Sequence, residues 1–232
     1  AMAIANHLRD FVARVDVISN DPASIVKTRY IDVNSSQKHV EINLFKAESY
    51  DKPVDYNAYD AVIVADFGHG FCNKLDLPNG LHLMCQTNSN NFGFNRVSKW
   101  KEIQKSSVCI DLREASLQMN KEVSLDTESE LRELYDYEIS TKDLFVTLGR
   151  SGVVFTNGSE IEMHPAYKTD VVDTIGAGDG FFAFASLMSH LNWEPHLRLA
   201  IPSLAASLTT TWLANEHHIT KSRLIDHAEK NL

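Results

Sequence analysis

The sequence has few cysteines and no long hydrophobic run. Its three cysteines, Cys72, Cys85 and Cys109, are odd in number and none is spaced as CxxC, so we expect neither a disulfide framework nor a zinc knuckle. The longest apolar runs, residues 61–65 and 181–185, fall far short of the roughly 20 residues that a membrane helix needs. We therefore expect a cytoplasmic protein, located in a reducing compartment, that does not span a membrane.

Basic residues are also scarce. Acidic residues outnumber them by 31 to 22, and the net charge is −9 at pH 7. Such a chain repels nucleic acid and anionic lipid, so binding of either by bulk charge is excluded. The sequence contains neither a GxxxxGK[ST] motif nor a GxSxG elbow, so a P-loop enzyme and a serine hydrolase are not expected.

Short apolar segments alternate with segments of helical periodicity along the 232 residues. We expect strands at residues 60–66, 81–85, 108–111 and 144–148 and two within 152–163, and helices at 1–15, 95–104, 113–119, 126–138, 176–192 and 195–213. This alternation predicts an α/β protein with a mostly parallel sheet. In such sheets ligands bind outside the carboxyl ends of the strands.

Residues 25–46 differ from the rest of the chain. Two β-rich segments, 25–33 and 39–45, alternate between apolar and polar residues and flank the polar turn 34–38. This pattern predicts a β-hairpin. We interpret it as an excursion from the main sheet that serves as a lid.

Residues 173–180, Asp-Thr-Ile-Gly-Ala-Gly-Asp-Gly, precede the most apolar predicted helix. Gly176 and Gly178 permit a tight turn that exposes backbone amides, and the start of a helix adds positive potential, so this segment predicts an anion site. Asp179 fits a base that accepts the proton of an acceptor hydroxyl beside a transferring phosphoryl group, and the helix start should keep it ionised. The alternative is a Gly-rich helix cap in which Asp179 only complements the helix dipole.

Residues 173–179 resemble the DTxGAGD signature of the ribokinase-like (PfkB) carbohydrate kinases. Residues 146–155 resemble the strand–loop–strand that lies along the nucleotide in that family, and residues 111–114 resemble its NxxE element with Asp in place of Asn. The alternative for 111–114 is a charged helix start. The resemblance covers most of the chain and implies a three-layer α/β/α fold with a mostly parallel central sheet and a small β lid.

The resemblance implies an ATP-dependent phosphotransferase that acts on a hydroxyl of a small sugar or sugar phosphate, with ATP, Mg²⁺ and K⁺. Asp179 would be the catalytic base, and the amides of Ile175, Gly176, Ala177 and Gly178 would form the anion hole. Cofactor-binding residues would be Asp111, Thr147, Gly149, Gly152 and Thr174. Glu114 would organise Mg²⁺ through water, and Asp173 would lie near the monovalent cation.

Several polar positions narrow the substrate. Lys27 and Arg29 resemble the lid strand of bacterial heptose-7-phosphate kinases, the kinase part of ADP-heptose synthesis proteins, and Asp66-Phe-Gly-His-Gly70 resembles their D-Y-G-K-G loop with His69 in place of Lys. We therefore predict substrate contacts by Asn6, Lys27, Arg29, Asp66, Asn88 and Asn90. The alternatives are solvated strand residues for Lys27 and Arg29 and a helix-capping loop for the two later asparagines.

The sequence opens inside an apolar helical pattern, with no capping residue before Ala1. We therefore expect residues 1–232 to be one kinase domain that lacks its N-terminal part. We also expect a homodimer formed through the lid and a fused sugar-nucleotide domain outside this chain. Two other functions stay open: a kinase of a nucleoside, a pyrimidine alcohol or a hexose phosphate, and a non-catalytic ligand-binding module of a multidomain sugar-nucleotide protein.

Overall fold

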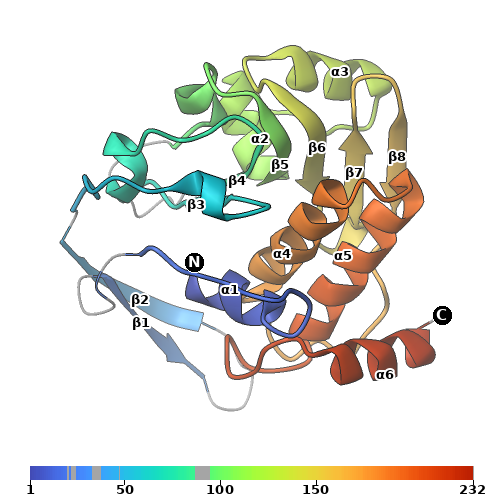
Figure 1. Ribbon diagram of the computed structural model, residues 1–232. Coiled ribbons are helices and arrows are strands. Elements are labelled where there is room, and N and C mark those ends of the chain that lie inside the picture. Colours follow the sequence, from blue (N-terminus) through green and yellow to red (C-terminus); the bar gives the residue numbers. More distant parts are fainter. Residues whose placement is uncertain (20, 22–24, 33–37, 47, 87–94, 232) are drawn as a thin grey trace.

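A computed structural model describes residues 1–19, 21, 25–32, 38–46, 48–86 and 95–231 (Figure 1). The main sheet contains β3 (Ile63–Asp66), β4 (Leu81–Cys85), β5 (Lys105–Asp111), β6 (Thr141–Thr147), β7 (Val153–Thr156) and β8 (Ile161–His164). The helices are α1 (Met2–Leu8), α2 (Leu112–Met119), α3 (Glu128–Asp136), α4 (Ala177–His190), α5 (Pro195–Thr209) and α6 (Lys221–Asn231). A separate hairpin is formed by β1 (Ile25–Ile31) and β2 (Lys38–Phe45).

The six strands of the main sheet follow one another in chain order. Strands β3 to β6 are parallel, whereas β7 and β8 add to the sheet in antiparallel orientation. The predicted α/β fold with a mostly parallel sheet is therefore confirmed. Because parallel strands share one direction, the carboxyl ends of β3, β5 and β6 lie at the same edge of the sheet.

Helices cover both faces of the sheet. Alternate residues of the strands face opposite sides: Leu83, Val108 and Leu144 pack with α2 and α3, and Met84, Cys109 and Phe145 pack with α1, α4 and α5. Figure 1 shows α4 and α5 side by side on the second of these faces, where they pack against each other. Strands buried on both faces explain the continuous apolar runs in the sequence.

The hairpin lies apart from the main sheet, on the side of α1 (Figure 1). Its two strands pair in antiparallel register from Ile25 opposite Phe45 to Ile31 opposite Lys38. The residues of β1 alternate between half-buried and exposed, so the hairpin has an inner and an outer face. The predicted hairpin is confirmed.

Two helix predictions need correction, and one helix was missed. The first helix ends at Leu8 instead of residue 15, because the chain turns there and Asp10 accepts a hydrogen bond from the amide of Lys221 at 2.7 Å. The predicted helix at 95–104 is only a short 3-10 turn, Val97–Trp100, among the residues that the structure describes. Helix α6 was not predicted, since only His227 of its residues is buried and its sequence is mostly polar.

Lys105 marks the amino end of β5, opposite to the end formed by Asp111. Its side chain is 1% exposed, and its ammonium donates hydrogen bonds to the carbonyl oxygens of Trp100, Ile103 and Ile139 at 2.7, 2.8 and 2.7 Å. These bonds join the connection from β4 to β5 with the connection from α3 to β6, at the amino end of β5. None of the helices in the described part of the chain is long and apolar enough to cross a membrane.

Candidate active site

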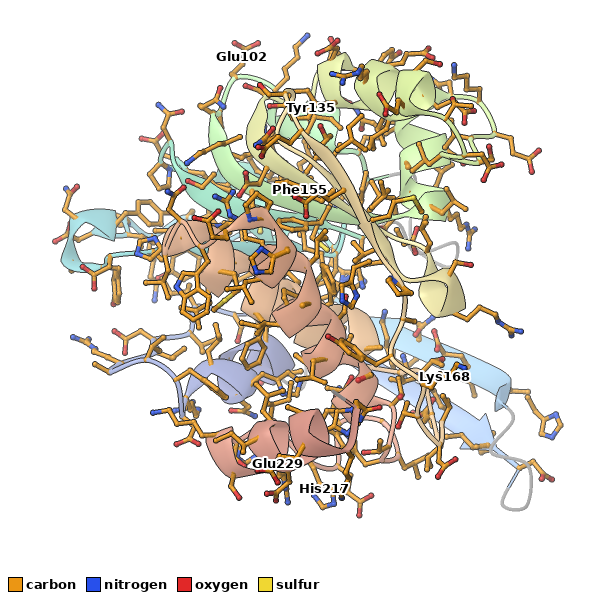
Figure 2. The ribbon with its side chains drawn as sticks, turned by 90° about the vertical axis from the view of Figure 1, so that its right-hand side faces the viewer. Glu102, Tyr135, Phe155, Lys168, His217 and Glu229 are labelled. Carbon is orange, nitrogen blue, oxygen red and sulfur yellow. The ribbon has the colours of Figure 1, made fainter. Side chains whose placement is uncertain are left out.

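A cleft of about 2180 Å³ opens at the carboxyl ends of the parallel strands. It is bordered by the last residues of β3, β5 and β6, by the start of α4 and by the inner face of the hairpin. Lys168, on the connection from β8 to α4 (Figure 2), also lines it. The cleft therefore lies at the sheet edge where the sequence predicts a ligand site.

Most of the predicted site residues line this cleft. They are Lys27, Arg29, Asp66, Asp111, Glu114, Thr147, Gly149, Gly152, Thr174, Ile175, Gly176, Ala177, Gly178 and Asp179. Asn6 and Asp173 do not line it, and Asn6 accepts a hydrogen bond from Nε of Arg9 at 3.0 Å. Asn88 and Asn90 lie outside the described residues.

Asp179 lies in the first turn of α4 and points one oxygen, Oδ1, into a buried position without a hydrogen-bond partner among the described residues. Burial raises the pKa of Asp179, and nearby positive charges, including Lys27, act in the opposite direction. The helix start favours the ionised form, as the sequence indicates, but burial is the larger influence on the pKa. The carboxylate therefore has a greater proton affinity than an exposed aspartate.

The loop before α4 is fixed by Asp173. Its two carboxylate oxygens accept hydrogen bonds from the amides of Ile175 and Ala214, each at 3.0 Å. Gly176 has φ +90°, and a Cβ atom there would lie 2.6 Å from Oδ1 of Asn215. Glycine is required at this position by both the left-handed backbone and the close approach of Asn215.

Fewer backbone amides are available to bind an anion than the sequence predicts. The amide of Ile175 is bound to Asp173, and the amide of Ala177 donates to the carbonyl of Thr174 at 3.3 Å. The Gly178 amide makes no hydrogen bond within the described chain, and a Cβ atom at Gly178 would meet none of its heavy atoms within 4 Å. An amide without a hydrogen bond in the first turn of a helix, on a residue that has no side chain, fits an anion such as a phosphate group.

Asp111 and Glu114 form a capping box at the start of α2. The amide of Glu114 donates to Oδ1 of Asp111 at 2.7 Å, and the amide of Asp111 donates to Oε2 of Glu114 at 2.8 Å. The charged helix start, given above as the alternative for residues 111–114, is therefore present. Both side chains also line the cleft, so the two interpretations are compatible.

The β6–β7 loop contains two glycines with different surroundings. Gly152 has φ +104°, and a Cβ atom there would lie 2.0 Å from the carbonyl oxygen of His164. Gly149 has φ +58° and no atom of the described chain near its Cβ position. Gly152 is thus required by the packing of β8, whereas Gly149 leaves open space beside Thr147 in the cleft wall.

Asp66 holds the loop that follows β3. Its carboxylate accepts hydrogen bonds from the Gly68 amide at 3.0 Å, Nζ of Lys99 at 2.8 Å and Nε1 of Trp100 at 3.0 Å. These donors anchor residues 95–100 against the loop, which is why that segment does not continue as a helix. His69 follows in the same loop, where burial and then the charge of Lys27 lower its pKa.

Sequence reasoning missed two residues on the inner face of the hairpin, Glu41 and Asn43. They lie opposite Arg29 and Lys27 in the hairpin register. The period-2 alternation of the strands could have placed them on the same face as the two cations. In the described part of the chain no group of three His, Cys, Asp or Glu side chains is arranged to hold a metal ion.

The sequence is similar to known carbohydrate kinases. Residues 106–211 match the family model of pfkB family carbohydrate kinases. A ribokinase from Lactococcus lactis is 48% identical over 61 residues, a match that spans 25% of this chain and 20% of the ribokinase. The chain therefore corresponds to only a fifth of that curated relative's length in this match.

Solved structures show the same fold. The crystal structure of a ribokinase from Thermotoga maritima superposes with a TM-score of 0.67 at 16% identity and covers 88% of this chain and 69% of that chain. An aminoimidazole riboside kinase from Salmonella enterica, complexed with aminoimidazole riboside and an ATP analog, has a TM-score of 0.51 at 18% identity over 64% of this chain and 52% of that chain. The architecture is thus ribokinase-like.

Proposed function

We propose that this chain, a ribokinase-like protein whose residues 106–211 match the PfkB carbohydrate kinases, transfers the terminal phosphoryl group of ATP to a hydroxyl of a small sugar. The observation that carries this proposal is the position of Asp179. One oxygen of its carboxylate has no hydrogen-bond partner among the described residues. The residue lies in the first turn of α4, next to the amide of Gly178, in the cleft at the carboxyl ends of the strands.

Asp179 would act as general base. Its carboxylate takes the proton of the acceptor hydroxyl as the hydroxyl oxygen attacks the γ-phosphorus and the bond to the β-phosphate breaks. The raised pKa of Asp179 favours this proton transfer. The same shift moves the acid limb of the pH–rate profile toward neutral pH, because the base must be ionised before it can act.

The amide of Gly178 would stabilise the charge on the transferring group, since it lies in the first turn of α4, at the positive end of the helix, and makes no hydrogen bond within the described chain. Asp173 would support this role by holding the loop through the amides of Ile175 and Ala214, and it is also our candidate for the vicinity of a K⁺ ion. The residues of the cleft fit a nucleotide, because Gly149 and Gly178 both leave space that a side chain would fill.

Thr147, Gly149, Gly152, Thr174 and Asp111 would form the wall against the nucleotide. Glu114 would organise Mg²⁺ through water, as a carboxylate suited to this hard cation. When bound, Mg²⁺ offsets the negative charge of the phosphates. Asp111 and Glu114 are already oriented by their capping box, so these groups need little rearrangement for binding.

We propose a phosphorylated sugar, such as a heptose 7-phosphate, as one substrate class to test. The support is Lys27, whose charge influences both Asp179 and His69 from the inner face of the hairpin. A cation between the lid and the catalytic carboxylate suits an anionic substituent on the sugar. Arg29 lies on the same face, two residues further along β1.

We also propose that a second copy of this chain covers the outer face of the hairpin. Five apolar side chains are 42–64% exposed there: Val26, Tyr30, Val40, Ile42 and Leu44. Adjacent apolar residues on a two-stranded ribbon form a surface typical of an interface. The inner face of the same ribbon would then close the active site.

The kinase domain would also extend beyond these residues. Strand β3 pairs with β4 only, so within the described chain its other edge has no neighbouring strand. The Thermotoga maritima ribokinase is matched over 69% of its length. We propose that a further strand of the domain adds at this edge and completes the wall of the cleft.

The decisive experiment is the substitution Asp179→Asn. We expect turnover to fall by about 10²–10⁴-fold, the usual contribution of a general base, while ATP binding is retained. Phosphate transfer from Mg-ATP is measured with D-ribose, aminoimidazole riboside and heptose 7-phosphate, for this chain and for a form extended at its N-terminus. Asp226→Asn, an exposed acid on α6, is the matched control.

The outcomes separate the alternatives. Transfer by the wild type that Asp179→Asn removes supports the proposal, and activity only in the extended form shows that the sheet edge must be completed. Normal turnover in Asp179→Asn contradicts the assigned base. ATP binding without transfer to any of the three acceptors, in both forms, favours the non-catalytic module.

A further inference from the structure

The inner face of the hairpin carries four polar side chains, two of which line the cleft. Lys27 lies opposite Asn43, and Arg29 lies opposite Glu41, in the antiparallel register of β1 and β2. Lys27 and Arg29 line the cleft, whereas their neighbours Val26 and Thr28 face outward. Glu41 and Asn43 therefore share the cleft-facing side of the hairpin.

Glu41 holds two of these side chains at once. Its Oε2 accepts a hydrogen bond from Nε of Arg29 at 2.9 Å, and its Oε1 accepts one from Nδ2 of Asn43 at 3.2 Å. The Glu41 side chain is only 8% exposed, so this carboxylate is shielded from solvent and its contacts are well defined. Arg29 and Asn43 are thus oriented before any ligand arrives.

The orientation of the Asn43 amide follows from this contact. Its nitrogen must face the Glu41 carboxylate, because its oxygen in that place would be repelled. The Oδ1 atom therefore points the other way, where it is buried and has no hydrogen-bond partner among the described residues. A buried acceptor without a donor costs free energy, so the site gains when a donor is supplied.

A ligand with an O–H or N–H group can supply the missing donor. A sugar hydroxyl can donate to Oδ1, whereas an ionised phosphate offers acceptors only. Arg29 is paired with Glu41, so Lys27 is the cation on this face that fits an anionic group, and Asn43 fits a neutral hydroxyl beside it. The inner face thus distinguishes two kinds of group on one ligand.

We propose that Asn43 determines substrate specificity by accepting a hydrogen bond from a hydroxyl of the sugar, and that Glu41 is the positioning residue that orients it. This inference rests on the proposed kinase function. A site that hydrogen-bonds a substrate hydroxyl discriminates strongly against an analogue without that hydroxyl, because a buried polar group is then left unpaired. An apolar pocket discriminates less strongly between substrates that differ by one methylene group. A monodeoxy sugar that lacks the recognised hydroxyl should thus be a poor substrate.

The test compares Asn43→Leu, which has nearly the same shape, with Thr28→Val, the matched control on the outer face. We expect Asn43→Leu to raise KM for the sugar at least about tenfold, with kcat within about threefold and KM for Mg-ATP unchanged. Glu41→Gln keeps the shape of the side chain but replaces the ion pair with Arg29 by a weaker neutral hydrogen bond. It should raise KM for the sugar by a smaller factor than Asn43→Leu does.

Monodeoxy analogues of the phosphorylated sugar provide a readout that a merely structural role would not change. With the analogue that lacks the recognised hydroxyl, wild type and Asn43→Leu should have equal kcat/KM. With every other monodeoxy analogue, kcat/KM should remain higher for the wild type than for Asn43→Leu. Thermal unfolding shows whether each variant folds. If Asn43→Leu does not fold, Asn43→Ala takes its place in the same comparison.

Failure of this inference and failure of the kinase function give different results. A sugar from the three-acceptor panel that wild type and Asn43→Leu phosphorylate with equal KM overturns the role of Asn43 and leaves the kinase function standing. A difference between wild type and variant that persists with every monodeoxy analogue overturns it as well. Absence of transfer to all three acceptors, both by the wild-type chain and by its N-terminally extended form, overturns both.

Discussion

Three glycines in residues 173–180 serve different purposes. Gly176 adopts a left-handed backbone beside Asn215, and Gly178 leaves space over a helix amide. Gly180 lies where α4 crosses α5, and a Cβ atom there would be 2.8 Å from Cγ2 of Thr209. One short motif therefore combines a turn, a ligand-binding position and a helix-packing position.

This division predicts different results for two alanine substitutions. Gly178→Ala should leave the thermal stability unchanged or slightly higher, because alanine favours helix, but it should weaken ATP binding and phosphate transfer. Gly180→Ala should destabilise the fold by about 1–3 kcal/mol, because its methyl group crowds Thr209. Denaturant unfolding and ATP titration of both variants measure the two effects, and equal loss of stability in both would contradict the assignment.

At the scale of elements, the hairpin is the part of the molecule with two different faces. The inner face carries charged and amide side chains and presents Lys27 and Arg29 to the cleft, and the outer face presents exposed apolar side chains. Alternation along each strand creates both faces from the seven residues of β1 and the eight residues of β2. Association at the outer face would therefore influence the geometry of the inner face directly.

The proposed dimer predicts the effect of charges on the outer face. Ile42→Lys together with Leu44→Lys should convert a dimer to a monomer, because two buried ammonium groups would lack partners in the interface. Sedimentation equilibrium of wild type and variant measures the mass. Met163→Lys, at an equally exposed apolar position on β8, is the control and should leave the dimer intact. A wild type that is monomeric at high concentration would refute the interface.

For the molecule as a whole, two buried histidines link stability to pH. His7 accepts a hydrogen bond from the amide of Ile219, and Nδ1 of His82 lies 2.8 Å from the hydroxyl of Ser107. Burial lowers the pKa of each to about 4 from the ordinary value of 6.5. Both imidazoles are therefore neutral in the fold at pH 7.

The unfolded chain binds more protons than the fold between pH 6.5 and pH 4. The stabilisation is complete above pH 6.5 and is lost as the pH falls toward 4, by about 2 kcal/mol for each histidine between pH 7 and pH 5. Urea unfolding at the two pH values measures this loss. His82→Asn should be less stable at pH 7 but should show a smaller decrease on acidification, and an unchanged decrease would contradict the role of His82.

The sequence predicts the features that depend on local patterns. The alternation of residues 25–46 identified the hairpin, and the apolar runs at 81–85 and 144–148 identified central strands, because both signals lie within the segments themselves. Asp10, just beyond the end of α1, accepts a hydrogen bond from the amide of Lys221, more than 200 residues away. No local pattern contains such information.

The site shows the same division. The motif at 173–179 located the start of α4 and its carboxylate. The engagement of the Ile175 amide by Asp173 and the orientation of Asn43 by Glu41 depend on side-chain geometry, which residue types alone do not specify. For Asp111 and Glu114 the sequence offered two interpretations, and the structure contains the capping box in a position that also lines the cleft.

The enclosed Lys105 has a practical consequence for studying this chain. An amine-reactive reagent modifies exposed lysines within the folded protein, but it can reach Nζ of Lys105 only after the loops that supply its three carbonyl acceptors have separated. The labelling rate of this one side chain, followed by mass spectrometry, would therefore time the opening of the sheet at the amino end of β5. It would do so without an added dye, at a position remote from the cleft, and in the presence or absence of any ligand.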